Sequence, residues 1–342
     1  MAPQELESLI TFSARIGRDL NLVQAGGGNT SLKDNGVLWI KASGKWLVNA
    51  DQEEMFVPVP LADIMRDIAD GRERYEEYTT SSGLLLRASV ETTMHAVLPH
   101  RVVVHVHSVQ AIAWAVRADG KEALDSRLRG VRWAWIPYIH PGLPLARRIQ
   151  QAQSEKPDVL ILENHGLVVA ADRCDTAAAL LEEVERRLTI LPQPAPDFDA
   201  PALTRLADGT QWRVHRDEEI HALATNRLSA MIASTGTMYP DHCVYLGPAA
   251  ALVRVGESVE STVNQYMARY SYQPAFVLVE GKGVLSSSEL SRAGRELLFC
   301  LKRVVERIPA DTEIRYLEDF QVAKLMNWDA EKYRISIARL QQ

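Results

Sequence analysis

Cysteine is scarce in this sequence. The 342 residues include 3 cysteines, Cys174, Cys243 and Cys300, which lie far apart and form no CxxC pair. An odd, small number of distant cysteines argues against a disulfide framework and favours a reducing compartment. We therefore expect all three to behave as small buried hydrophobic side chains.

An excess of positive charge and long hydrophobic runs are also lacking. Lys and Arg number 38 against 44 Asp and Glu, so the formal net charge is -6, and nucleic acid is excluded as an expected partner. No apolar run is long enough to cross a bilayer, and acidic residues within the first twenty positions are unlike a signal peptide. We expect a cytoplasmic protein without a membrane partner.

What is present is an ordinary globular composition, with 46% hydrophobic and 24% charged residues. A length of 342 residues suits one large domain or two. The clearest boundary is the stretch 192–197, where Pro192, Pro194 and Pro196 interrupt any helix and predict an extended linker. We therefore predict two domains, residues 1–195 and 196–342.

Hydrophobic periodicity predicts both helices and strands in each part. Helical spacing marks 3–22, 109–116, 144–153, 175–191, 217–233 and 287–307, and a charged, helix-like stretch covers 61–80. Strands are predicted at 37–41, 133–138, 243–246, 276–280 and 159–162, the last continuing through 167–170.

Three histidines suggest a metal site. His105 and His107 stand on a predicted strand, Val-Val-Val-His-Val-His, so both side chains project to the same face. His165 follows a second buried strand, and three protein ligands with an open fourth position make the catalytic type of zinc site. The alternative is that each histidine is a hydrogen-bonded core residue.

Two small loops suggest either a hairpin or an anion cradle. Gly28 and Asn29 belong to a glycine run followed by hydroxyl residues, and Ser43 and Gly44 form a second loop soon afterwards. Glycines let backbone N–H groups approach an anion closely. The spacing matches neither GxGxxG nor GxxxxGK[ST], so nucleotide binding is not indicated. A hairpin with glycine-rich ends and a phosphate cradle both remain open.

A carboxylate precedes the histidine strand. Ser89 is expected to cap a short helix, with Glu91 in its first turn and His95 one turn later on the same face. Stabilisation of the helix N-terminus is one role for Glu91. The other is proton transfer beside the metal, because that helix leads directly into the strand of His105.

Five motifs lie in order along roughly the first 190 residues. They are Gly28-Asn29-Thr30-Ser31, Ser43-Gly44, Ser89-Val90-Glu91 with His95, His105-Val106-His107 and Asn164-His165-Gly166. In these motifs the chain resembles the class II aldolase/adducin family, and within it the aldolase part of the bifunctional rhamnulose-1-phosphate aldolase/alcohol dehydrogenase proteins. Residues 200–342 resemble the extension found there, and no Rossmann fingerprint occurs in the sequence.

The resemblance implies an α/β fold, with a central, mainly antiparallel sheet between helices and a smaller C-terminal α/β extension. It also implies a site in which Zn2+ or another divalent metal is held by His105, His107 and His165. Glu91 would move the proton. The phosphate cradle would comprise Gly28, Asn29, Ser43, Gly44 and Ser89.

The implied activity is that of a zinc-dependent lyase. Retro-aldol cleavage of a ketose phosphate would give dihydroxyacetone phosphate and an aldehyde through a metal-stabilised enediolate. The simplest members have a second serine where this chain has Val90, so one phosphate hydrogen bond is missing or replaced. A sugar-phosphate 4-epimerase, a sugar-acid phosphate decarboxylase and a non-catalytic adducin-like binding protein are the alternatives. Family members form tetramers, so a homo-oligomer is expected.

Overall fold

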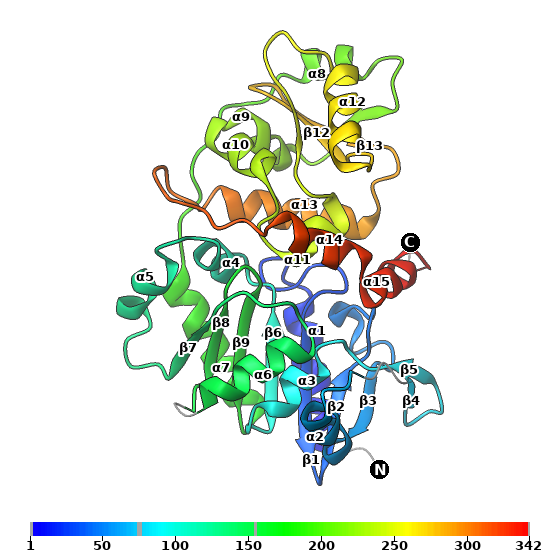
Figure 1. Cartoon of the computed structure of the whole chain (residues 1–342), viewed down its shortest axis with the longest axis vertical. Helices are drawn as coiled ribbons and strands as arrows, with labels where there is room; N and C mark the ends of the chain where they lie inside the picture. Colours follow the sequence, from blue (N-terminus) through cyan, green and yellow to red (C-terminus); the bar gives the residue numbers. More distant parts are fainter. Residues whose placement is uncertain (1–2, 74–76, 154–155, 341–342) are drawn as a thin grey trace. The chain divides into compact units, whose positions relative to one another are not determined.

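The structure, a computed structural model, describes residues 3–73, 77–153 and 156–340. They form two compact units (Figure 1). The first unit contains the chain up to Ala115, Asp119–Thr189 and the described residues from Lys332 onward, and the second contains Val116–Ala118 and Ile190–Glu331. The division into domains 1–195 and 196–342 stays a prediction.

A mainly antiparallel sheet forms the centre of the first unit. Among the described residues its strand order is β3-β2-β1-β6-β9-β8-β7, and neighbours are antiparallel except β7 and β8. The strands are β1 (Asn29–Asp34), β2 (Val37–Lys41), β3 (Phe56–Pro60), β6 (Val102–Val106), β7 (Trp133–Ile136), β8 (Val159–Leu162) and β9 (Gly166–Ala171). The expected α/β fold with a central, mainly antiparallel sheet is confirmed.

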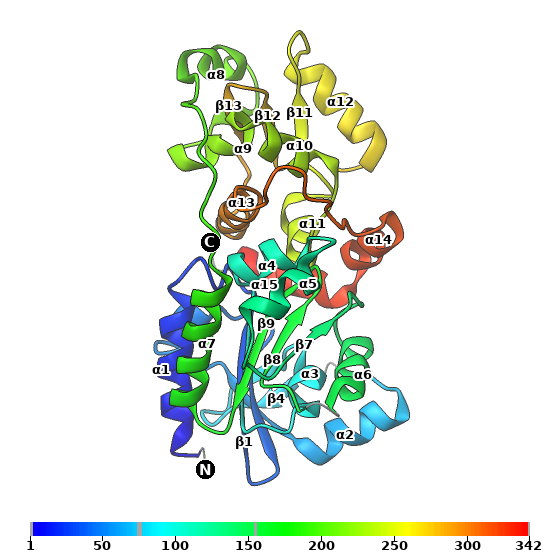
Figure 2. The ribbon, with the colours of Figure 1, turned by 90° about the vertical axis from the view of Figure 1, so that its left-hand side faces the viewer.

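Helices cover both faces of this sheet. Figure 2 shows α1 (Glu5–Gly17) and α7 (Cys174–Leu188) on one face, and α2 (Leu61–Asp70), α3 (Thr92–Val97) and α6 (Leu143–Ala152) on the other. Every residue of β6, β8 and β9 is therefore buried, which explains their nearly continuous hydrophobic sequences.

The other elements of the first unit surround this sandwich. They are η1 (Leu47–Asn49), α4 (Val109–Ala115), α5 (Gly120–Arg127), the two-stranded ribbon of β4 (Glu77–Thr79) and β5 (Leu85–Arg87), and most of α15 (Asp329–Leu340). The return of α15 to the first unit was not expected from the sequence.

The second unit contains a four-stranded sheet with order β10-β13-β12-β11. Its strands are β10 (Trp212–Val214), β11 (Ala251–Val253), β12 (Phe276–Val279) and β13 (Gly283–Ser287). Its helices are α8 (Ala200–Ala207), η3 (Glu218–His221), α9 (Ala222–Thr225), α10 (Arg227–Thr235), α11 (Pro240–Leu246), α12 (Val259–Tyr270), α13 (Arg292–Val305) and α14 (Asp319–Asn327).

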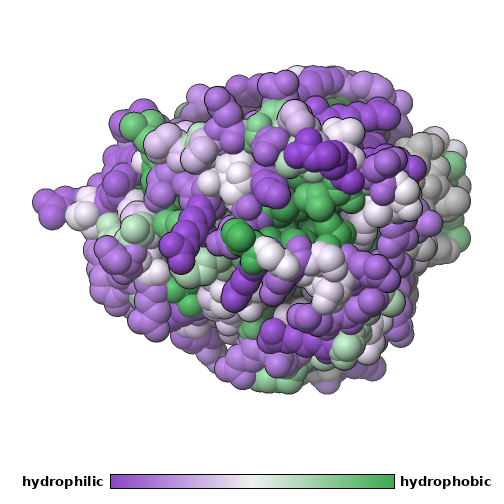
Figure 3. All heavy atoms as spheres, turned by 90° about the horizontal axis from the view of Figure 1, so that it is seen from above, coloured by the Kyte–Doolittle hydropathy of each residue, from purple (hydrophilic) through white to green (hydrophobic). Residues whose placement is uncertain are grey.

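The surface seen in Figure 3 is mostly hydrophilic, with hydrophobic side chains gathered between polar ones. Within the described parts of the chain, no helix has the length and apolar character needed to cross a membrane.

Several predicted elements differ from the structure. The segment 167–170 does not continue β8: Asn164 adopts a left-handed conformation with φ 52, and β9 returns antiparallel to β8. The segment 243–246 is the end of helix α11, which begins at Pro240, a residue suited to a first helical turn.

Two predicted helices are shorter than expected. Of the range 61–80, α2 ends at Asp70 with Gly71 in the left-handed region, residues 74–76 lie outside the described residues, and β4 follows. The range 217–233 is divided where Asn226 caps a new helix by accepting the Ser229 N–H.

Candidate metal and proton-transfer site

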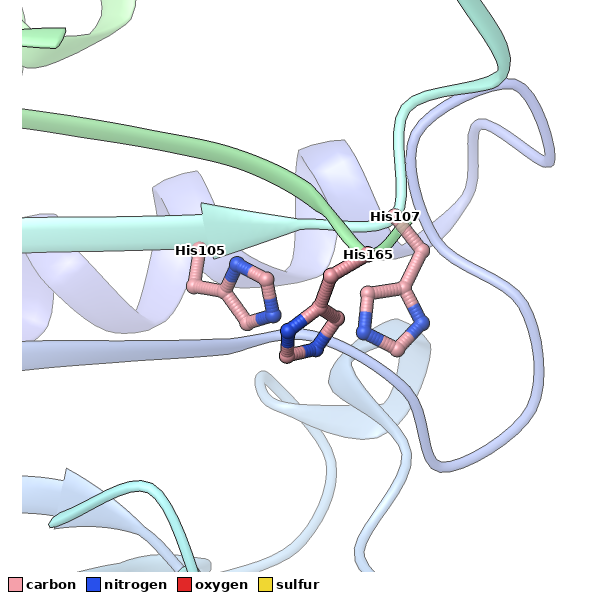
Figure 4. Close-up of side chains that lie close together, drawn as sticks. All are labelled: His105, His107 and His165. Atoms are coloured by element: carbon pink, nitrogen blue, oxygen red, sulfur yellow. The ribbon is translucent and has the colours of Figure 1, made fainter. Parts of the chain in front are cut away.

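The three predicted histidines come together in the first unit. His105 lies in β6, His107 follows the end of that strand, and His165 lies in the turn between β8 and β9 (Figure 4). Their metal-ligating atoms all lie within 4.8 Å of one another. The ring centroids of His105 and His165 are 4.9 Å apart, and those of His105 and His107 are 5.0 Å apart.

A glycine allows the turn of His165 to lie close to β6. A Cβ at Gly166 would lie 2.6 Å from the carbonyl oxygen of Val106 and 3.3 Å from Cε1 of His105. Any other residue would therefore push β9 and His165 away from the strand that carries the other two histidines.

A backbone carbonyl sets the orientation of one imidazole. Nδ1 of His105 lies 3.0 Å from the carbonyl oxygen of Leu167. Since a carbonyl only accepts, Nδ1 carries the proton, and the lone pair of a neutral ring is at Nε2. This arrangement, in which the second ring nitrogen fixes the tautomer, is common around metal-binding histidines.

Glu91 lies against the histidines. Its Oε2 is 3.4 Å from Nε2 of His105, and its Oε1 is 3.4 Å from Nε2 of His165. Burial raises the pKa of Glu91, but electrostatic attraction from the imidazoles of His105, His165 and His107 and a hydrogen bond from Asn29 outweigh burial and lower this pKa to about 2. The carboxylate is therefore ionised at neutral pH.

The predicted cap at Ser89 is displaced. Helix α3 begins at Thr92, and the Ser89 hydroxyl accepts the N–H of Glu91 at 3.2 Å instead of an N–H within the helix. Ser89 therefore helps to hold the backbone of Glu91 beside the histidines.

Asn29 stands next to this carboxylate. Its Nδ2 donates to Oε2 of Glu91 at 2.8 Å and lies 3.4 Å from the hydroxyl of Ser89. Asn29 pairs with His105 across β1 and β6, so both side chains project from the same face of the sheet.

The loops predicted as an anion cradle converge. Gly28 has φ 62, and a Cβ there would lie 2.9 Å from the carbonyl oxygen of His105. Nζ of Lys41 donates to the carbonyl of Gly26 at 2.8 Å, which ties the glycine run to β2. The N–H of Ser43 donates to the carbonyl of Arg87 at 2.8 Å.

The last helix contacts one of these loops, which sequence reasoning missed. Gly44 has φ 76, and a Cβ on it would lie 2.9 Å from Cβ of Ile337 in α15. One turn earlier, the ring of Tyr333 lies 4.9 Å from the guanidinium carbon of Arg87. Nothing in the local sequence of α15 indicates this contact.

The donor set fits a divalent transition metal. Three imidazoles with an adjacent carboxylate are typical ligands and neighbours of a catalytic Zn2+. Nitrogens at about 2.1 Å from one zinc ion lie about 3.4 Å apart. A modest inward movement of the rings is therefore sufficient for binding, although these atoms do not specify the ion.

Residues 7–191 match the family described as Class II Aldolase and Adducin N-terminal domain. The chain belongs to this family. The match covers more than half of the 342 residues and all the site residues predicted from the sequence. The expectation of an enzyme of this family is confirmed.

One curated relative matches about half of the chain. Over 205 residues the chain is 29% identical to the "Uncharacterized oxidoreductase YuxG" of Bacillus subtilis (strain 168), covering 54% of this chain and 30% of that protein. The chain thus spans less than a third of the length of this curated relative. A likeness to part of a longer oxidoreductase agrees with the resemblance to bifunctional aldolase/dehydrogenase proteins.

Solved structures also align with about half of the chain. The N-terminal class II aldolase domain of a conserved Thermoplasma acidophilum protein has 24% identity and a TM-score of 0.45, covering 55% of this chain and 93% of its own. The L-fuculose-1-phosphate aldolase of Thermus thermophilus has 20% identity and a TM-score of 0.35, covering 53% and 91%.

Proposed function

We propose that the protein is a metal-dependent lyase of the class II aldolase type, which cleaves a ketose phosphate to dihydroxyacetone phosphate and an aldehyde. The observation that supports this most is the position of Glu91. Its two carboxylate oxygens each lie 3.4 Å from a different histidine of the cluster. A carboxylate beside a metal site, but not needed as a ligand, suits proton transfer next to a carbonyl.

In this proposal His105, His107 and His165 hold the ion. When bound, a divalent ion would supply Lewis-acid stabilisation of the negative charge that develops on the substrate oxygens. The Leu167 carbonyl keeps the imidazole of His105 in the tautomer required of a ligand.

Glu91 would carry the proton that the reaction moves at carbon. In cleavage, the bond between C3 and C4 of the ketose breaks, its electron pair stays on the phosphorylated fragment, and the C4 hydroxyl loses its proton as the aldehyde forms. Ionised Glu91 would take up that proton and deliver it to C3, so the overall reaction neither gains nor loses one. In the synthetic direction ionised Glu91 removes that proton, and its low pKa favours this form.

The converging loops would hold the phosphate. Gly28, Ser43 and Gly44 lie in short loops whose backbones are tied to neighbouring strands, and Asn29 and Ser89 add polar groups beside them. Backbone N–H groups in such glycine-containing loops form anion-binding concavities. Ser43, whose N–H donates to the carbonyl of Arg87, would contribute its hydroxyl. Val90 contributes no hydroxyl, so the cradle depends more strongly on these loops.

The test is a panel of ketose 1-phosphates and sugar-acid phosphates incubated with zinc-loaded protein. We expect cleavage of at least one ketose phosphate into two fragments, with about one metal per chain by elemental analysis. A single isomerised product would identify an epimerase, and release of carbon dioxide from a sugar acid would identify a decarboxylase. Glu91→Gln should retain the metal and lose at least about 10²-fold in rate.

Assembly into a homo-oligomer stays a prediction. Sedimentation of the purified protein would decide it, and a tetramer is the expected result.

A further inference from the structure

A chain of hydrogen bonds runs from the core of the first unit to Glu91. His95 in α3 is fully buried, with 0% exposure. Its Nδ1 lies 2.7 Å from the hydroxyl oxygen of Ser31, and its Nε2 contacts Oδ1 of Asn29. The other end of the Asn29 amide donates to Glu91 at 2.8 Å.

Matching periodicities bring these groups together. Asn29 and Ser31 are two residues apart on β1 and therefore share one face of the sheet. Glu91 and His95 are four residues apart, and the N–H of His95 donates to the carbonyl of Glu91 at 3.2 Å. Asn29 and Ser31 on one face of β1 therefore meet Glu91 and His95, which are one helical turn apart.

The direction of every bond follows from the orientation of the Asn29 amide. Nδ2 of Asn29 donates to Oε2 of Glu91 at 2.8 Å, which fixes the orientation of the amide. Oδ1 of Asn29 then faces His95, which must donate from Nε2. A neutral imidazole with its proton on Nε2 accepts at Nδ1, and the hydroxyl of Ser31 supplies that hydrogen.

The neutral form of His95 is favoured independently. Burial, opposed by the negative charge of Glu91, lowers the pKa of His95 to about 3. At neutral pH the ring therefore has one donor and one acceptor, as the chain of bonds requires.

We propose that His95 is a positioning residue for the reaction: through Asn29 it holds the carboxylate of Glu91 in the orientation from which the proton is transferred. The inference rests on the role of Glu91 proposed above. The side-chain hydrogen bonds of His95 run to Ser31 and Asn29, so its effect reaches the reacting atoms through Asn29 and Glu91.

A merely structural role for His95 makes a different prediction. A core histidine that only fills space would be replaced well by another aromatic ring, such as phenylalanine. A positioning residue is replaced better by glutamine, whose side-chain amide can donate to Asn29.

The experiment compares His95→Phe and His95→Gln with the wild type, all as full-length, metal-loaded protein. We expect His95→Phe to keep its metal content and KM but to lose about 10²-fold in kcat, the effect of a small misplacement of a catalytic group. His95→Gln should recover to within about tenfold of the wild type. Met94→Ala, which removes a buried side chain from the same helix, should lower Tm and leave kcat unchanged.

A second measurement does not depend on activity. In protein labelled with 15N-asparagine, the Asn29 side-chain amide, assigned by its loss in Asn29→Asp, should exchange slowly with solvent in the wild type and His95→Gln but rapidly in His95→Phe. If no substrate of the panel is cleaved by the wild type, the proposed function fails and this exchange still decides the positioning role. Wild-type kcat in His95→Phe, or amide protection unchanged by His95→Phe, would overturn the inference.

Discussion

Asn29 and His105 occupy paired positions on the antiparallel strands β1 and β6. The side chain of one contacts Glu91 at 2.8 Å, and Nε2 of the other lies 3.4 Å from the same carboxylate oxygen. The register of β1 against β6 therefore sets the distance between His105, a proposed metal ligand, and Asn29, which holds the proposed proton carrier Glu91. A slip of β1 by one residue would turn Asn29 to the opposite face of the sheet.

Gly166→Ala should weaken metal binding. The added Cβ would meet the Val106 carbonyl oxygen at 2.6 Å, so β9 must shift and take His165 with it. We expect the free energy of unfolding to fall by about 1–3 kcal/mol. Zinc affinity, measured by competition with a chromophoric chelator, should fall at least tenfold.

The matched control for this variant is Gly26→Ala. A Cβ on Gly26 lies no closer than 3.6 Å to any neighbour, which is ordinary contact. Equal losses of metal affinity in the two variants would show that the close approach at Gly166 is not what places His165.

The sequence allowed the ligands and their strand to be predicted because those features are local. Alternation along β6 is enough to place His105 and His107 on one face, and β8 occupies the predicted range 159–162. The turn at Asn164 was missed because the valines and leucines on both sides suit one long strand as well as two short ones.

Contacts between distant segments carry no such local signal. Ile337 reaches Gly44 from the far end of the chain, and a helix of mixed composition gives no indication of its partner. For the path from His95 to Glu91 through Asn29, the sequence shows only the one-turn spacing of Glu91 and His95 and the two-residue spacing in β1. Recognising it required the pairing of two elements that only the fold provides.

Metal should stabilise the folded protein through its histidines. A ligand that binds only the native state raises the free energy of unfolding by about 2.7 kcal/mol when its concentration is 100 times Kd. We therefore expect zinc to raise Tm in the wild type by several degrees, and chelation to reverse the shift.

His107→Ala should abolish most of this zinc-dependent shift. The control is His215→Gln in the second unit, whose imidazole bonds Ser286 there, and it should respond to zinc as the wild type does. A wild-type response in His107→Ala would contradict the assignment of His107 as a ligand.

Glu185 should make the first unit less stable as the pH rises. Burial, partly opposed by a hydrogen bond to Ser108, raises the pKa of Glu185 to about 7. The folded protein then binds more protons than the unfolded chain between about pH 4.5 and 7. The contribution of Glu185 to stability is therefore fully present below that window and is lost as the pH rises through it.

Glu185→Gln removes this titration. In urea unfolding, we expect the free energy of unfolding of the variant to match that of the wild type at pH 5 and to exceed it at pH 8 by on the order of 2 kcal/mol. Glu182→Gln, on the same helix with a side chain that is 68% exposed, should show no such difference between the two pH values.

His221 should give the second unit the opposite pH dependence. Its Nδ1 accepts the N–H of Val284 at 3.0 Å and its Nε2 lies 3.2 Å from the carbonyl oxygen of His215, while its ring stacks on Phe198. Burial lowers the pKa of His221 to about 4. The unfolded chain therefore binds more protons between about pH 4 and 6.5, and stability falls as the pH drops through that window.

His221→Gln tests this because glutamine has a donor and an acceptor but does not titrate. The loss of stability between pH 7 and 5 should be smaller in His221→Gln than in the wild type, as measured by urea unfolding followed through tryptophan fluorescence. His100→Gln is the control, because His100 lies in the first unit and bonds Asp158. This variant should lose as much stability between pH 7 and 5 as the wild type. An identical acid response in His221→Gln and the wild type would mean that protonation of His221 does not limit the stability of the second unit.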